Sequence, residues 1–267
     1  TLLFNTRRSS YNVKQYVSNK FTVENYPDSM LPTIAATWVT ASGNKDDGSP
    51  YMGSAAQRHM VVKAMKAAIA ANTDIREDKF TYSLIAAPGY PELVTDMVGL
   101  NADRKYTGFV IGDVPFTLPA NGVQITNYSS GVSGVYGNGI TTPSEYLGIF
   151  YPHALTSDVY GNEILQPASH MMLRTFIRSD NNSYQWFAPA GTRRGLIDNA
   201  TDIGYLKTVG TVNEFVRSGI SQGLRDTMYL HAVNPITILP GIGLLAFGQK
   251  TRSGTDTAMN RINVARL

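Results

Sequence analysis

The chain of 267 residues has no cysteine, little charge and no long apolar run. Without cysteine it can form no disulfide bond, no thiolate zinc site and no cysteine nucleophile. No apolar run approaches the roughly 18 residues that a membrane-spanning helix needs. The N-terminus also lacks the basic-then-apolar order of a signal peptide. We therefore expect no membrane partner.

Charged residues make up 16% of the chain, against about 25% in typical soluble domains. The hydrophobic content of 43% is sufficient for a sizeable core. The net charge is +3, and arginine doublets occur only at Arg7-Arg8 and Arg193-Arg194. Nucleic-acid-binding proteins usually cluster their basic residues, so we expect no nucleic-acid partner. A polar surface rich in Asn, Ser, Thr and Tyr favours extended contact with other proteins.

Short apolar runs alternate with helical patterns along the chain. Ser54 can cap an alanine-rich helix over residues 55–72, in which apolar residues recur at helical spacing. Further helices are predicted at 91–100, 167–178 and 212–220. Strands are predicted at 80–87, 108–111, 146–151, 186–188, 227–233, 236–239 and 244–248.

This alternation predicts an α/β fold, a sheet with helices on its faces and parallel strands buried on both sides. Residues 1–50 form a smaller, turn-rich N-terminal part. Residues 114–144 contain no charged residue and are dense in Gly, Ser and Asn. A connection of this length is usually functional or mobile. Two interpretations stay open: a flexible glycine loop, and a surface that a neighbouring subunit orders.

Catalytic motifs are incomplete. The segment from Gly131 to Gly134 resembles a nucleophile elbow, but Val135 stands where the motif needs glycine. A hydrolase using Ser130 or Ser133 is retained as an alternative function. The four histidines are far apart, and none lies three or four residues from another histidine or a carboxylate. We therefore predict no catalytic residue and no metal ligand.

A second alternative function is a nucleotide-binding module at residues 243–251. The segment Gly243-Leu-Leu-Ala-Phe-Gly-Gln-Lys-Thr251 approaches the phosphate-binding loop, but Gln249 separates the glycine from Lys250 where the motif requires adjacency. The four residues between the glycines are apolar. A core strand with a basic end fits these residues better, and no cofactor is predicted.

Several segments, taken in order along the chain, match one family of proteins. The strongest local signature is Ala188-Pro-Ala-Gly191 followed by Arg194-Gly195. The other matching segments are Gly43–Gly48, Leu84–Gly89, Gly108–Pro115, Tyr146–His153, Pro167–His170, Asn234–Ile236, Gly241–Gly243, Phe247-Gly248, Thr251 and Asn260–Leu267. Together they resemble the contractile tail sheath proteins of bacteriophages and related injection machines. Departures from that family include Phe247 where Trp is commoner, and Ala168 and His170 at a helix start.

The resemblance implies a core of subtilisin-like topology and a structural role without enzymatic activity. The subunit would form hexameric rings, stacked helically around a tail tube and attached to a baseplate. Contraction would drive the tube through the host envelope for genome ejection, without nucleotide consumption. The expected location is the tail of the virion, after assembly in the host bacterial cytoplasm.

The resemblance also implies a domain organisation. Residues 1–42 would be an N-terminal segment, part of a separate protruding domain. Residues 43–267 would be the sheath core, cut before a C-terminal assembly domain, because the apolar-alternating segment Asn260–Leu267 stops without a cap or turn. Such a trimmed, protease-resistant fragment is expected to be monomeric alone. Arg193 and Arg194 are the candidate residues for contact between subunits.

Overall fold

The computed structural model describes residues 53–132, 134, 136–137, 139–209 and 212–267. Among these, residues 53–71, 208–209 and 212–213 belong to one unit, and the described residues of 72–207 with 214–267 belong to the other. Within the first unit, α2 (Gly53–Ala71) confirms the predicted alanine-rich helix. The predicted N-terminal segment 1–42 lies outside the described residues, so its separate domain stays a prediction.

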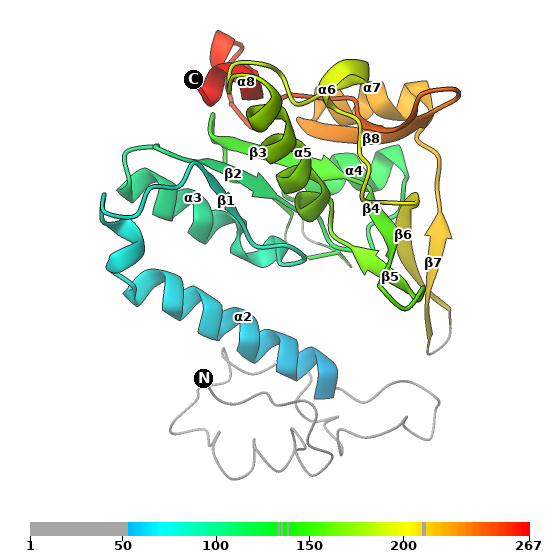
Figure 1. Ribbon diagram of the computed structural model, residues 1–267. Coiled ribbons are helices and arrows are strands. Elements are labelled where there is room, and N and C mark those ends of the chain that lie inside the picture. The colour runs from blue at the N-terminus through cyan, green and yellow to red at the C-terminus, as the bar shows by residue number, and fades with distance from the viewer. Residues whose placement is uncertain (1–52, 133, 135, 138, 210–211) are drawn as a thin grey trace. The chain divides into compact units, whose positions relative to one another are not determined.

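A five-stranded sheet in the order β1-β2-β3-β8-β9 forms the centre of the second unit (Figure 1). The first four strands run parallel, and β9 runs antiparallel to β8. This confirms the predicted α/β class. The strands are β1 (Leu84–Ala86), β2 (Phe109–Gly112), β3 (Leu147–Tyr151), β8 (Val233–Leu239) and β9 (Gly243–Ala246).

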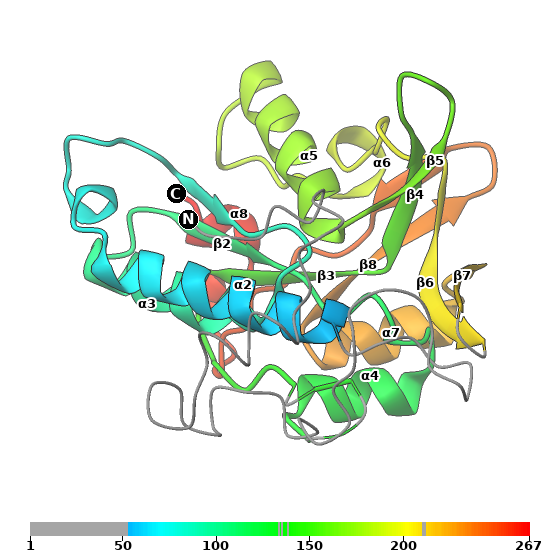
Figure 2. The ribbon, with the colours of Figure 1, turned by 90° about the horizontal axis from the view of Figure 1, so that it is seen from below.

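Helices cover both faces of this sheet (Figure 2). On one face lie α3 (Val94–Asp103), α4 (Gly122–Ser129) and α7 (Gln222–Leu230). On the other lie α5 (Ala168–Asn182) and the short α6 (Gly191–Arg194). All residues of β2 and β3 are buried, as continuous apolar runs in a covered parallel sheet should be. Single-turn 3₁₀ helices occur at Asp74–Arg76, Pro91–Leu93 and Ala258–Asn260.

A second, four-stranded sheet has the order β5-β4-β6-β7 and was not predicted from the sequence. Its strands are β4 (His153–Ser157), β5 (Glu163–Gln166), β6 (Asp202–Val209) and β7 (Val212–Arg217). The helix predicted at 212–220 is therefore wrong. A short apolar pattern fits either element, and here strand pairing with β6 decides the outcome.

Two predicted strands are also wrong. Residues 222–230 form α7, capped by the Ser221 hydroxyl oxygen, which accepts from the Leu224 amide at 3.3 Å. The strand predicted at 227–233 is thus mostly helix. Residues 184–187 form a turn in which the Phe187 amide donates to the Tyr184 carbonyl at 3.0 Å. The aromatic residues that suggested a strand at 186–188 are exposed in this turn.

The uncharged segment 114–144 contains α4 instead of one long loop. The Asn121 side chain caps this helix by accepting from the Val123 amide at 2.9 Å. The Arg252 guanidinium, from beyond β9, donates to the carbonyls of Ser129 and Ile140 at 2.9 and 2.7 Å. Contacts within the chain therefore order the described part of this segment, and the flexible-loop interpretation is wrong there.

The C-terminal segment also differs from its predicted alternating pattern. Residues Ile262–Ala265 form a short helix, α8. The following Arg266 is buried, pairs with Asp180 of α5 at 2.5 Å and lies 4.9 Å from the centre of the Phe176 ring. The Arg266 side chain thus binds the C-terminal segment to α5.

Candidate interaction surface

The carboxyl ends of parallel strands are where open α/β sheets usually bind ligands. Here that position holds a buried polar cluster around Asp113, which follows β2. Its carboxylate accepts from the Gly89 amide at 2.8 Å, the Ser169 amide at 2.7 Å and the Ser169 hydroxyl at 2.6 Å. Asp113 is 2% exposed. These bonds join the turn after β1, the end of β2 and the start of α5.

His153, the first residue of β4, lies in the same buried region. Its Nε2 is 3.0 Å from the Val114 carbonyl, and its Nδ1 accepts from the Ala168 amide at 3.3 Å. These contacts fit the neutral tautomer with its proton on Nε2. Burial lowers the pKa of His153, although the nearby Asp113 charge acts in the opposite direction. The imidazole is therefore neutral in the folded protein.

Asp113, His153 and Ser169 are the residue types of a hydrolytic triad, but their arrangement does not fit one. The Ser169 hydroxyl donates to Asp113 and not to His153, and both imidazole nitrogens contact the backbone. All three residues are buried away from any substrate. The cluster is a structural joint. Sequence reasoning missed it, although a polar residue directly after a strand and a serine at a helix start were visible signals.

The residues of the two alternative functions are arranged differently from what catalysis or nucleotide binding requires. Ser130 is an exposed C-cap of α4, and Ser133 lies outside the described residues. In segment 243–251, β9 pairs with β8 over four residue pairs, so the backbone is a strand and not a loop around a phosphate. The Lys250 ammonium donates to the Tyr229 carbonyl at 3.1 Å.

The described part of the chain contains no group of three or more His, Cys, Asp or Glu side chains that could hold a metal ion. Within the same residues, no helix is both long and apolar enough to cross a membrane.

The predicted contact residues Arg193 and Arg194 lie in α6, beside an exposed group of aromatic rings. Tyr184 and Trp186 stack with ring centres 5.0 Å apart, and Trp186 stacks on Phe187 at 4.8 Å. The Arg194 guanidinium lies 4.5 Å from the centre of the Phe187 ring. We call Tyr184, Trp186, Phe187 and Arg194 the aromatic stack. Its rings are 40–68% exposed.

The backbone beneath the aromatic stack is fixed at several points. The Gly195 carbonyl accepts from the Ala246 amide of β9 at 2.8 Å. A Cβ at Gly195 would lie 2.5 Å from the Ala246 carbonyl oxygen, so only glycine fits this close approach. The Asn263 side-chain amide, from α8, donates to the Trp186 carbonyl at 3.2 Å. The exposed rings are therefore held on a positioned turn.

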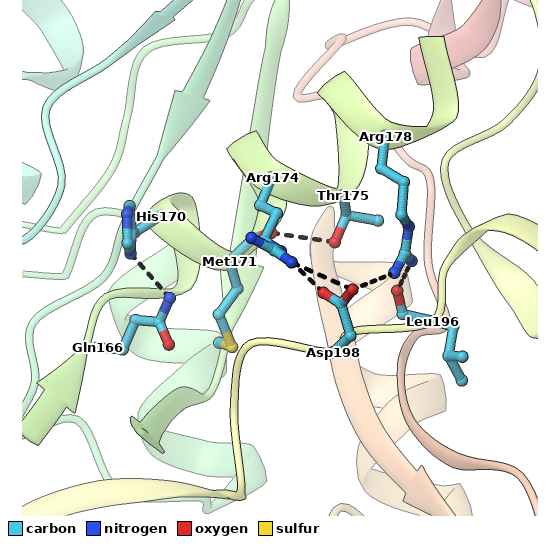
Figure 3. Close-up of polar contacts among 8 residues, drawn as sticks. All are labelled: Gln166, His170, Met171, Arg174, Thr175, Arg178, Leu196 and Asp198. Atoms are coloured by element: carbon cyan, nitrogen blue, oxygen red, sulfur yellow. Dashed lines mark hydrogen bonds and ion pairs between the residues drawn. The ribbon is translucent and has the colours of Figure 1, made fainter. Parts of the chain in front are cut away.

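Two other arginines near α6 are already paired (Figure 3). Arg174 and Arg178, on α5, bind the two Asp198 carboxylate oxygens at 2.9 and 3.0 Å. Arg178 also donates to the Leu196 carbonyl. The hydrogen bond from Arg174 is the main cause that lowers the pKa of Asp198. Neither Arg193 nor Arg194 belongs to an ion pair among the described residues, so both charges are available to a partner.

The same view shows polar contacts of the first turns of α5 and of the strand before it. The Gln166 side-chain amide donates to His170 Nδ1 at 2.8 Å, and the Thr175 hydroxyl donates to the Met171 carbonyl at 3.0 Å (Figure 3). These contacts are local to α5 and the strand before it. They place no nucleophile beside a base.

Sequence comparison relates this chain to proteins of known role. No protein-family model matches it. The tail sheath protein of Enterobacteria phage T4 is 29% identical over 160 residues, 59% of this chain and 22% of that protein. The resemblance to tail sheath proteins is confirmed. The tail sheath protein of Vibrio phage KVP40 is 29% identical over 89 residues, 33% of this chain and 11% of that protein. The matched segments thus span less than a quarter of these relatives.

Solved structures share the fold. The helical sheath of the anti-feeding prophage in its contracted state aligns with a TM-score of 0.51 and 18% identity, over 74% of this chain and 46% of that one. The contracted sheath complex of PVC, an extracellular contractile injection system, aligns with a TM-score of 0.50 and 20% identity, over 77% of this chain and 47% of that one. At these identities the likeness concerns the fold.

Proposed function

We propose that this chain is part of a structural subunit of a contractile tail sheath. The single observation that carries the proposal is the 29% identity with the T4 tail sheath protein over 160 residues. The fold shared with two contracted sheaths supports it. The buried Asp113 cluster also supports a role without catalysis, because its polar groups are used in joining secondary structures.

In this proposal the subunits form hexameric rings that stack helically around the tube protein and end at the baseplate. Contraction drives the tube through the host envelope for genome ejection. The subunit is located in the virion tail and assembles in the bacterial cytoplasm. Residues 43–267 supply the sheath core, with subtilisin-like topology, and segments outside this chain supply the arms that link subunits. The chain alone is then monomeric.

The aromatic stack and Arg193 are the proposed contact surface of this core. Exposed aromatic rings and arginines are the side chains most enriched at the energetic centres of interfaces. The stack presents three rings on a fixed turn, so little conformational entropy is lost when a partner covers them. The low overall charge of the chain suits many modest polar contacts that can be exchanged during contraction.

Electron microscopy of the full-length protein, expressed with its tube protein, tests the proposal. Tubes with a helical outer layer are expected. A protein that is folded by circular dichroism but adds no layer to the tubes would contradict the proposed function. Sedimentation of residues 1–267 alone should give a monomer, and long tubes from this chain alone would contradict the role assigned to the missing arms.

A further inference from the structure

The hairpin between β4 and β5 ends in two apolar side chains that nothing in the described chain covers. Val159 is 93% exposed and Tyr160 is 87% exposed, the highest values for large apolar residues in the described part of the chain. We call residues 158–162 the hairpin tip. Contiguous exposed apolar surface marks sites of contact with other proteins, and these two side chains are adjacent in the tip.

The hairpin tip is closed by its own hydrogen bonds. Asp158 Oδ1 accepts from the amides of Tyr160 and Asn162, each at 2.8 Å, and Oδ2 accepts from the Asn162 side chain at 2.9 Å. The Asp158 amide donates to the Asn162 carbonyl at 3.0 Å. The bonds from Asn162 lower the pKa of Asp158, which is therefore charged at neutral pH. These bonds thus fix the backbone of the hairpin tip, which presents two apolar side chains beside one negative charge.

A pocket of matching character lies on α7. It has a volume of 380 Å³, and its walls include Arg225, Asp226, Tyr229, Leu230, Pro235 and Phe247. We call it the α7 pocket. Its volume is at the lower end of the range of about 300–1,000 Å³ for ligand sites, a size suited to one or two side chains. Tyr229, Leu230 and Phe247 are partly exposed there, by 46%, 76% and 48%.

Charge at the α7 pocket complements the hairpin tip. The Arg225 guanidinium lies 5.2 Å from the Phe247 ring centre, and the Lys250 ammonium lies 4.9 Å from the Tyr229 ring centre. Neither cation forms an ion pair with a carboxylate among the described residues. With Asp226 on the wall, the pocket region has a net charge of +1. The Asp158 charge of an incoming tip therefore has two cations available to it.

The β4–β5 hairpin and helix α7 lie on opposite sides of the central sheet (Figure 2), so we infer that a chain does not insert its tip into its own pocket. We propose that the hairpin tip of one subunit inserts Val159 and Tyr160 into the α7 pocket of a second copy. A contact between two different patches of identical chains repeats from copy to copy and generates a helical array unless a ring closes. This inference rests on the proposed function and identifies one contact within the assembly.

The contact is small beside the roughly 1,600 Å² buried in a stable complex. It therefore does not join subunits in dilute solution. It acts once other contacts hold neighbours at high effective concentration. The experiment must accordingly use assembled full-length protein.

Cysteine cross-linking tests the contact directly, because residues 1–267 contain no native cysteine. Any cysteine elsewhere in the full-length protein is first replaced by serine. Tyr160→Cys is then combined with Leu230→Cys, and assembled sheaths are oxidised. A ladder of covalent dimers and higher oligomers is expected on non-reducing gels. The control combines Tyr160→Cys with Val123→Cys, on exposed α4 outside the pocket, and should give at least tenfold less cross-linked product.

Each other outcome is decisive. Sheaths that assemble but cross-link no more than the control would overturn the tip-to-pocket contact while leaving the proposed function intact. Cross-linking of Tyr160→Cys to another tail protein would overturn a second copy as the partner. If the unsubstituted protein formed no sheath, the proposed function would fail and this contact with it.

A second measurement avoids engineered disulfides. Val159→Ser with Tyr160→Ser should lower the fraction of protein sedimenting as sheath several-fold, without changing the midpoint of thermal unfolding, because both side chains are exposed. Val123→Ser is the matched control and should assemble normally. Assembly of the double variant equal to that of the control would overturn the proposal.

Discussion

The buried Asp113 cluster and the exposed aromatic stack use their side chains in opposite ways. Asp113 accepts three hydrogen bonds from groups of its own chain and is 2% exposed. Tyr184 of the stack is 68% exposed and contacts Trp186 on one ring face. In the first region the interactions are complete within the chain. In the second region, the exposed area of the aromatic rings and the charge of Arg194 are accessible to a partner.

Substitutions in the buried cluster should therefore change stability, and substitutions in the aromatic stack should change assembly. A buried and satisfied polar group is costly to alter, because its former partners lose their hydrogen bonds where water cannot replace them. An exposed ring can be removed with little effect on folding, while a binding partner loses an anchor. Residue types alone would have suggested the reverse, with Asp, His and Ser as the functional group and the aromatic residues as core.

The largest effect is expected from Asp113→Ala. The substitution removes the carboxylate that two backbone amides and one hydroxyl bind in a buried region, so the free energy of unfolding should fall by about 3–5 kcal/mol. Urea unfolding of the full-length protein, followed by tryptophan fluorescence, measures the change. A loss below about 1 kcal/mol would show that the cluster is not the structural joint described above.

Substitution of Arg252 should have the next largest effect. Arg252→Met leaves three carbonyls without their donor, those of Ser129, Ile140 and His231. The free energy of unfolding should fall by about 2–3 kcal/mol, and segment 114–144 should become sensitive to proteolysis. Arg225→Met, with one comparable carbonyl bond, is the matched control. Equal protease sensitivity of the two variants would contradict the role of Arg252 in holding segment 114–144.

His153 should make stability depend on pH. Its pKa is lowered in the folded protein, whereas the unfolded chain binds a proton near pH 6.5. The unfolded state therefore binds more protons as pH falls below about 6.5, and stability should decrease there by at most about 1.4 kcal/mol per pH unit. Urea unfolding at pH 7.5 and 5.5 measures this slope.

Two variants show whether His153 causes the pH dependence of stability. His153→Gln should be less stable than the original protein at pH 7.5 but should lose less stability on acidification. Val123→Ser, at an exposed position without a titratable group, is the control and should retain the original slope. A slope unchanged in His153→Gln would show that another group titrates.

Changes in the aromatic stack should alter assembly with little effect on stability. Trp186→Ala should lower the free energy of unfolding by about 1 kcal/mol or less and reduce sheath formation several-fold. Arg193→Glu and Arg194→Glu should also weaken assembly. Lys207→Glu, with the same charge change at another exposed position, is the control. Normal assembly of Trp186→Ala, Arg193→Glu and Arg194→Glu would remove this surface from the proposed interface.

The smallest effect is expected from Asp198→Asn. The Asp198 carboxylate is 42% exposed and pairs with two arginines at the surface. Exposed ion pairs usually contribute less than about 1 kcal/mol. The midpoint of urea unfolding should shift slightly at low salt and hardly at all at high salt. A loss comparable to that of Asp113→Ala would contradict the contrast between buried and surface groups.

The central sheet was predictable because its strands are continuous apolar runs. Residues 108–111 and 146–151 correspond closely to β2 and β3, and the strands predicted at 236–239 and 244–248 overlap β8 and β9. The second sheet was missed because the strand His153–Ser157 has no alternating pattern and its pairing with Glu163–Gln166 depends on a turn closed by Asp158.

The candidate surface was predictable only in part. The doublet Arg193-Arg194 is visible in the sequence, and its place in the contact surface stays a prediction. The stacking of Trp186 between two rings was not visible, because aromatic residues in a row favour a buried strand on pattern alone. The Asp113 cluster could not be predicted, because no local sequence pattern indicates that residues 89, 113, 153 and 169 lie together in the fold.

The attachment of Arg252 has a consequence for the conditions under which the protein works. Its three acceptors are carbonyl dipoles, so dissolved ions have no opposing side-chain charge to screen. The uncharged segment should therefore stay anchored from dilute media to concentrated brine. The surface pairs of Asp198 weaken over the same range of ionic strength.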